Sequence, residues 1–178
     1  MALIGYEPIT LLKAIGNMLR GELNSINPNR LFTVRSVDTN WEEFVEKTGW
    51  ANKGGIVWIK VREGGEKFEM CSNQQVRAMT TYLIRCAVPC MAQRGRGGTM
   101  EDEDFLDDFV NSVYSKVVEV GVSNQEWTDE RGNQLTYDCK VEHGGMFTSK
   151  QYSTPLFIFD TYFVTSNVFK YTAESVAS

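Results

Sequence analysis

Residues 76–88 read VRAMTTYLIRCAV, and residues 93–110 read QRGRGGTMEDEDFLDDFV. The first segment alternates side chains between two distinct faces, which predicts a long β-strand. The second begins as a loop rich in glycine and arginine and becomes an amphipathic helix with an acidic first turn. One face of this helix carries Phe105, Leu106, Phe109, Val110, Val113 and Val117. Residues 76–120 therefore predict a sheet with a helix packed across it.

The two faces of this strand differ in character. One face is predicted to meet the core, and it carries Val76, Ala78, Tyr82, Ile84, Cys86 and Val88. The other face holds Arg77 and Arg85, so we expect it to meet water or a partner at least in part. Pro89 is expected to end the strand.

The segments on either side predict further helices and strands. Residues 8–23 have helical spacing, with Leu11 and Met18 beside a stripe of Ile9, Leu12, Ile15, Leu19 and Leu23. A short helical turn is predicted after Thr39, which has capping-box spacing to Glu42. Strands are predicted at residues 31–37, 56–62, 67–71, 122–127, 134–141 and 156–164. Glycine-containing turns are predicted at 63–66, 129–133 and 143–145, and Gly121 is predicted to follow the long helix as its C-cap.

This order of elements predicts an α+β fold. The expected architecture is a mostly antiparallel sheet, with an N-terminal helix and a central amphipathic helix packed on one face. A length of 178 residues with 42% hydrophobic side chains suits a single domain that spans residues 1–178. Within it we expect a flexible N-terminus over residues 1–7, a loop at 91–100 and a frayed C-terminus over 172–178.

The residues that usually carry catalysis are sparse. Cys71, Cys86, Cys90 and Cys139 show no C-x-x-C spacing, so reduced thiols are predicted. The one histidine, His143, lies in a predicted turn, and neither a zinc site nor a histidine-activated nucleophile is expected. Residues 95–98 lack the Lys-Ser/Thr of a P-loop and precede an acidic helix that would repel phosphate. We therefore expect no cofactor and no enzyme activity.

Two charged clusters leave alternatives open. The acidic residues Glu101, Asp102, Glu103, Asp104, Asp107 and Asp108 could bind Mg²⁺ or Ca²⁺, but a solvated cap that satisfies the helix dipole is favoured. Arg94 and Arg96 resemble a single RGG-like element that could touch a nucleic-acid backbone, but a mobile surface loop is favoured. No apolar run reaches the length of a membrane span, and residues 1–20 lack a signal-peptide pattern, so we expect a soluble protein that is made in a cytosol.

Charge is distributed unevenly along the chain. Residues 1–97 hold 13 Lys/Arg and 9 Asp/Glu, whereas residues 98–178 hold 5 and 14, so balances of +4 and −9 make up the net −5. Either the two parts of the chain differ in charge without any role in assembly, or the basic side of one copy meets the acidic side of another. Such a head-to-tail contact closes into a ring when its rotation permits. The candidate interface charges are Arg77, Arg85, Glu101, Asp102, Asp104 and Asp108.

The order and lengths of these segments resemble the tail terminator proteins of tailed bacteriophages. The matching segments are residues 8–23, 31–37, 56–71, 76–88, 102–120 and 156–164, so the resemblance covers most of the chain, in pattern and size. It implies a structural virion protein that forms a ring, usually a hexamer, at the head-proximal end of the tail. This ring ends tail-tube polymerisation and joins the tail to the head connector.

The resemblance also implies partners. These are other copies of the chain, the tail tube protein and the head connector or neck proteins, with no membrane partner. Arg94 and Arg96 would lie in a loop that contacts DNA passing through the channel. Two alternatives remain open: another neck, tube or baseplate protein of a phage, or a metal-dependent enzyme that uses the acidic cluster at residues 101–108.

Overall fold

The computed structural model describes residues 2–3, 7–36, 40–50, 53–72, 74–90, 103–152 and 154–172. Within them the chain forms, in order, β1 (Ala2–Leu3), α1 (Pro8–Asn24), β2 (Leu31–Ser36), α2 (Trp41–Lys47), β3 (Lys53–Ser72), β4 (Gln75–Pro89), α3 (Glu103–Ser123), β5 (Asp138–Ser149) and β6 (Leu156–Thr172). The predicted α+β class with a mostly antiparallel sheet and a leading helix is confirmed.

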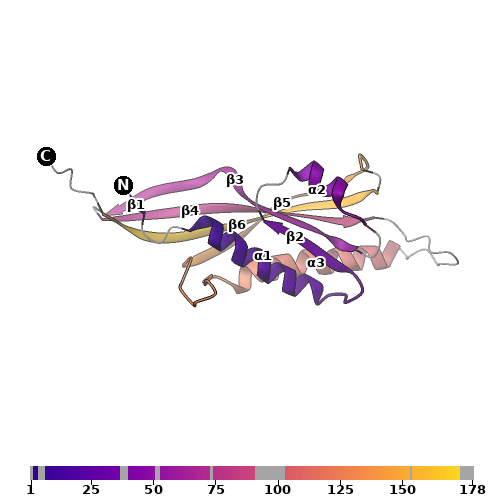
Figure 1. Cartoon of the computed structure of the whole chain (residues 1–178), viewed down its shortest axis with the longest axis horizontal. Coiled ribbons are helices and arrows are strands. Elements are labelled where there is room, and N and C mark those ends of the chain that lie inside the picture. The colour runs from indigo at the N-terminus through magenta and orange to yellow at the C-terminus, as the bar shows by residue number, and fades with distance from the viewer. Residues whose placement is uncertain are drawn as a thin grey trace.

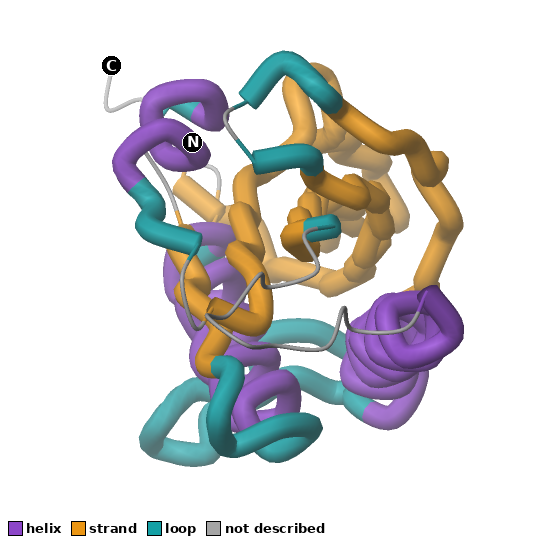
Figure 2. Tube along the Cα trace, turned by 90° about the vertical axis from the view of Figure 1, so that its right-hand side faces the viewer, coloured by secondary structure: helices purple, strands orange, loops and turns teal. Residues whose placement is uncertain are grey.

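The strands form one sheet in the order β2-β3-β4-β6-β5, and β1 pairs with the far end of β6. All pairs are antiparallel except β2–β3, which is parallel because α2 carries the chain back between these two strands. A view along the long axis shows that the strands follow a strongly curved path (Figure 2). This curvature is the usual consequence of strand twist accumulating across a sheet.

Helices lie on both faces of the sheet, with α1 and α3 on one side and α2 on the other (Figure 1). The face of β4 predicted to be the core face is confirmed, because its side chains are buried and those from Tyr82 to Val88 join a cluster with residues of α1, α3 and β6. The second face also contributes to a core, since Leu83 and Ala87 pack with Trp41, Phe44 and Val45 of α2. Each face of β4 therefore has its own apolar layer, and Arg77 and Arg85 lie on the α2 side.

Two glycine pairs that predicted turns lie inside long strands. Residues 63–66 do not form a hairpin, because β3 continues through them to Ser72 and pairs with β4 on both sides. The register changes between the Val61↔Tyr82 and Glu66↔Thr80 pairs, and Gly64 has a φ of 66°. Residues 143–145 are likewise part of β5, with a register shift between His143 and Gly145. A positive φ at glycine serves a bulge as well as a turn, so both turn predictions were wrong.

The segment after the central helix also differs from the prediction. Helix α3 runs on to Ser123, so Gly121 is not its C-cap, residues 122–123 are helical, and no strand forms at residues 122–127. Strand β5 begins at Asp138 rather than at residue 134. The predicted turn at residues 129–133 is confirmed, because the Arg131 and Asn133 backbone N–H groups each donate to Asp129 Oδ1 at 2.8 Å. These bonds to the ionised form lower the pKa of Asp129, with the Asn133 side chain as the largest contributor.

Smaller differences concern the helix ends and their apolar stripes. The N-cap of α2 is Asn40, whose side chain accepts a 3.0 Å hydrogen bond from Glu42 N, whereas Thr39 lies outside the described residues. Ile9 and Met18, which sequence placed in or beside the buried stripe of α1, are 46% and 38% exposed. Ala2 and Leu3 pair with Thr172 and Tyr171 at the two ends predicted to be loose. The remaining predicted flexible segments, including residues 91–100, lie outside the described residues.

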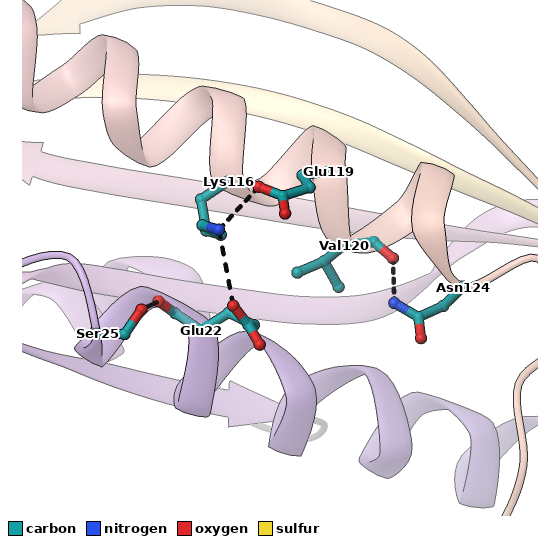
Figure 3. A network of polar contacts seen from close by, with 6 residues as sticks. All are labelled: Glu22, Ser25, Lys116, Glu119, Val120 and Asn124. Carbon is teal, nitrogen blue, oxygen red and sulfur yellow. Dashed lines mark hydrogen bonds and ion pairs between the residues drawn. The ribbon is translucent and has the colours of Figure 1, made fainter.

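Polar contacts join α1 to α3 beside the apolar layer (Figure 3). Lys116 Nζ of α3 lies 2.7 Å from Glu119 Oε2 and 3.7 Å from Glu22 Oε2 of α1. These carboxylates raise the pKa of Lys116, with the Glu119 bond as the largest cause. Since Lys116 bridges both helices, its charge helps to fix which face of α3 turns toward α1.

Candidate subunit interface

One end of the sheet extends as an arm beyond the helices (Figure 1). We define this distal arm as residues 66–72 of β3, 75–80 of β4 and 165–170 of β6, which are joined by continuous pairing. One of its faces is supported by the buried side chains of Val76, Ala78 and Phe169. The arm nevertheless exposes large apolar side chains. Phe68 and Met70, 51% and 60% exposed, lie on the same face as Val76 and Ala78, and Val168, 39% exposed, lies on the opposite face. Neighbouring exposed apolar side chains on an ordered sheet are typical of an interaction surface.

Arg77 lies on this arm and is exposed. Its position is directly opposite Glu69 of β3 and Val168 of β6. The sequence predicted that the face carrying Arg77 meets water or a partner, and the exposure of its side chain leaves it accessible to either. Arg77 therefore remains a candidate interface charge.

Arg85, on the same face of β4, is engaged inside the chain. Its Nε donates to Asp160 Oδ1 and its Nη2 to Asp160 Oδ2, each at 2.7 Å. The guanidinium also lies 5.4 Å from the centre of the Trp41 ring, and the bond to Asp160 raises the pKa of Arg85. The two side chains are 25% and 10% exposed. The charge of Arg85 is therefore compensated within the chain by Asp160 of the adjacent strand, and a role for Arg85 in a subunit interface stays a prediction.

The remaining predicted site residues are only partly placed. Arg94, Arg96, Glu101 and Asp102 lie outside the described residues. Asp104 is in the first turn of α3, and Asp108 is exposed further along this helix. Among the described residues, no group of three or more His, Cys, Asp or Glu side chains is arranged to hold a metal ion. Of the predicted charges whose side chains the structure describes, Arg77, Arg85 and Asp108, no two form an ion pair with each other.

Sequence analysis missed two open sheet edges. Beyond Ile59, where β2 ends its pairing, residues 60–72 of β3 pair only with β4 in the described part of the chain. The outer edge of β5 likewise meets no described strand, and Met146 and Phe147 on it are 45% and 48% exposed. These edges escaped prediction because the Gly64–Gly65 and Gly144–Gly145 pairs predicted turns, which would have divided each long strand.

The uneven charge along the sequence is also uneven in space. Elements from the basic first part of the chain, β2, β3 and β4, occupy one flank of the sheet, and α1 packs on β2 and β3. Elements from the acidic second part, β6 and β5, occupy the other flank, and α3 packs on them. The linear division of charge thus corresponds to two flanks of the described sheet, which is the arrangement a head-to-tail contact needs.

No protein-family model matches the chain, and no curated protein is similar to it. In the part of the chain that the structure describes, no helix is both long and apolar enough to cross a membrane.

The cysteines provide a chemical test of the fold. Cys71 is exposed on the distal arm, whereas Cys86 and Cys139 are buried. Burial raises the pKa of Cys86 above its ordinary value and that of Cys139 to about 11. We expect DTNB to modify Cys71 rapidly in the native protein. Cys86 and Cys139 should react at least about 100-fold more slowly, because the thiolate is the reactive form.

A Cys71→Ser variant is the control, and it should lose the rapid phase. If a fast phase equivalent to one or two thiols persisted after Cys90 had also been replaced by serine, the buried placement of Cys86, of Cys139 or of both would be wrong.

Proposed function

We propose that this chain is a structural virion protein that forms a ring at the head-proximal end of a phage tail. There it would end tail-tube polymerisation and join the tail to the head connector. The observation that carries the proposal is the distal arm, an ordered sheet extension that exposes Phe68 and Met70 on one face and Val168 on the other. Large apolar side chains in this setting are typical of surfaces that become buried on association.

The opposite charge of the two flanks supports a head-to-tail contact over a face-to-face one. In a two-fold dimer the same surface of each copy meets itself, so like charges would oppose each other. In a ring every copy presents its basic flank to the acidic flank of the next. The order of the elements and the length of the chain also resemble those of tail terminator proteins. This resemblance implies the same ring.

Imaging the purified full chain by negative-stain electron microscopy tests the proposal. We expect rings of countable subunits, and light scattering should give a mass that is a matching multiple of the 20.2 kDa chain. With isolated tail tubes, one ring should sit at the tube end and stop further addition of tube protein. Rings that stack into long tubes would instead indicate a tube protein. A monomer at every concentration, with tail tubes present as well, contradicts the proposal.

A further inference from the structure

Helix α2 covers only one end of its face of the sheet (Figure 1). Beyond α2, this face carries one cation at each of five successive levels of the paired strands. We define this cation row as Lys60, Arg62, Lys67, Arg77 and Lys170. The registers place Lys60 level with Leu83, Lys67 with Met79, Arg77 with Val168 and Lys170 with Gln75. Arg62 lies in the β3 bulge beside Thr81, since a Cβ atom at Gly65 would touch the Cβ atoms of both.

The spacing of the row is set by the geometry of the sheet. Successive levels of one face are two residues apart along a strand, which is about 6.6 Å. The row follows β3 as far as Lys67 and then crosses to Arg77 of β4 and Lys170 of β6, so its steps are about 6.6–8 Å between Cα atoms. Phosphates of an extended single nucleic-acid strand follow one another at a similar spacing. One strand laid along the row would therefore bring a phosphate close to each cation.

The charges of the row are available to an anion. Within the described residues none of these five cations forms an ion pair, whereas Arg85 on the same face is paired with Asp160. The Arg62 guanidinium lies 4.8 Å from the centre of the Tyr162 ring, and Lys60 Nζ lies 4.9 Å from the centre of the Trp58 ring. Such contacts hold a cation over the sheet without neutralising its charge.

The face is positive although the chain is acidic. Of the three carboxylates on this part of β3, Glu66 is opposite Thr80 on the other face, and counting Glu63 and Glu69 against the five cations leaves +3. Lys140, Asp138 and Glu142 of β5 add −1, so this face carries +2 and the remainder of the chain −7. These two β5 carboxylates are three strands away from β3, about 14 Å, which exceeds the screening length of about 8 Å.

An apolar strip lies beside the row. Tyr162 and Val164 of β6 and Met79 of β4 are half-buried on this face, and Val168 is 39% exposed. Unpaired bases can lie against such a strip, whereas the bases of a duplex are stacked inside it. An extended peptide could not add a strand here, because the backbone of β4 is already paired with β3 and β6. Binding by side chains to phosphates has no such requirement.

We propose that a single-stranded nucleic acid binds along the cation row, with its phosphates at the cations and its bases against the apolar strip. Contacts of this kind are largely independent of base sequence. The inference goes beyond the proposed function and does not require a ring, because a single chain carries the whole row.

Fluorescence anisotropy of a labelled oligothymidine of about twelve nucleotides, titrated with the full chain, tests the proposal. The logarithm of the association constant should fall with the logarithm of salt concentration, with a slope between about −2 and −3.5 for three to five neutralised phosphates. A duplex of the same length should bind at least about tenfold more weakly, because its bases cannot reach the strip. A slope near zero, or no binding at low salt, overturns the proposal. Equal or tighter binding of the duplex, or of polyglutamate, overturns it as well.

A double variant locates the site. Lys67→Gln with Arg77→Gln should weaken binding at low salt at least about tenfold and reduce the steepness of the salt dependence by about 1.4. Lys13→Gln with Lys150→Gln is the matched control, because it changes the net charge equally outside the row, and it should change affinity by less than about twofold. Equal losses in both variants would show that net charge and not the row binds the strand. Circular dichroism establishes folding, and the salt dependence of the unaltered chain tests the proposal without any substitution.

Ring formation and binding are separate results. Rings that do not bind the oligothymidine overturn this inference and leave the proposed function standing. A chain that binds the oligothymidine through the row but stays monomeric with tail tubes present supports this inference and contradicts the proposed function.

Discussion

Gly121→Val is expected to lower the free energy of unfolding by about 3 kcal/mol or more, and Gly121→Ala by about 1–3 kcal/mol, through overpacking. A Cβ atom at Gly121 would lie 2.7 Å from Phe163 Cε1 and 2.8 Å from Phe163 Cζ, and it would also collide with Val141 Cγ2. Phe163 is fully buried in the core, so its ring has little room to move. Gly121 thus lets α3 approach β5 and β6 closely. Urea unfolding followed by circular dichroism measures the change.

Gly21→Ala is the matched control for this prediction. Gly21 also lies within a helix, α1, but a Cβ atom there meets nothing within 4 Å. Alanine loses less backbone entropy than glycine on folding, so this substitution should stabilise the protein by about 0.5–1 kcal/mol. If Gly121→Ala stabilised the protein to the same degree, α3 would not lie as close to Phe163 as the structure places it.

Gly121 also shows which features of this fold the sequence patterns could predict and which they could not. The alternation in β4 and the stripes in α1 and α3 predicted most of the described side chains that are buried, with Ile9 and Met18 of α1 as exceptions, because burial repeats with the period of each element. Gly121 carries no such periodicity. A glycine near the end of a helix can serve as its C-cap, or it can let a sheet pack closely against the helix. The sequence pattern is the same in both cases, and only the position of Phe163 distinguishes them.

The long strands show the same limit. Gly64 and Gly145 have φ values of 66° and 135°. Turns and bulges both use such values, so the local sequence did not reveal that β3 and β5 continue past these residues. The open edges could not be predicted either, because an edge depends on which strand lies beside which. The ion-pair partner of Arg85 could not be predicted from the local sequence either, since Asp160 is 75 residues away.

We expect Asp160→Ala and Arg85→Met each to lower the free energy of unfolding by about 2–3 kcal/mol, somewhat less than for a fully buried ion pair. Asp160→Ala leaves a half-buried guanidinium without its two hydrogen bonds, and Arg85→Met leaves a carboxylate that is 10% exposed without a counter-charge. The double variant should lose less than the sum of the two, because it leaves neither charge unpaired. Urea unfolding of all four proteins gives this coupling.

The same variants separate an internal role for Arg85 from a role between subunits. If the ion pair serves only the fold, Arg85→Met should lower stability yet assemble into rings normally at temperatures where it stays folded. Arg77→Met is the comparison, since Arg77 lies on the same face of β4 but is exposed on the distal arm. It should leave stability nearly unchanged, as most exposed substitutions do. Loss of rings in Arg85→Met with intact folding would place Arg85 in the interface, because the loss of an internal ion pair alone would not prevent a folded subunit from assembling.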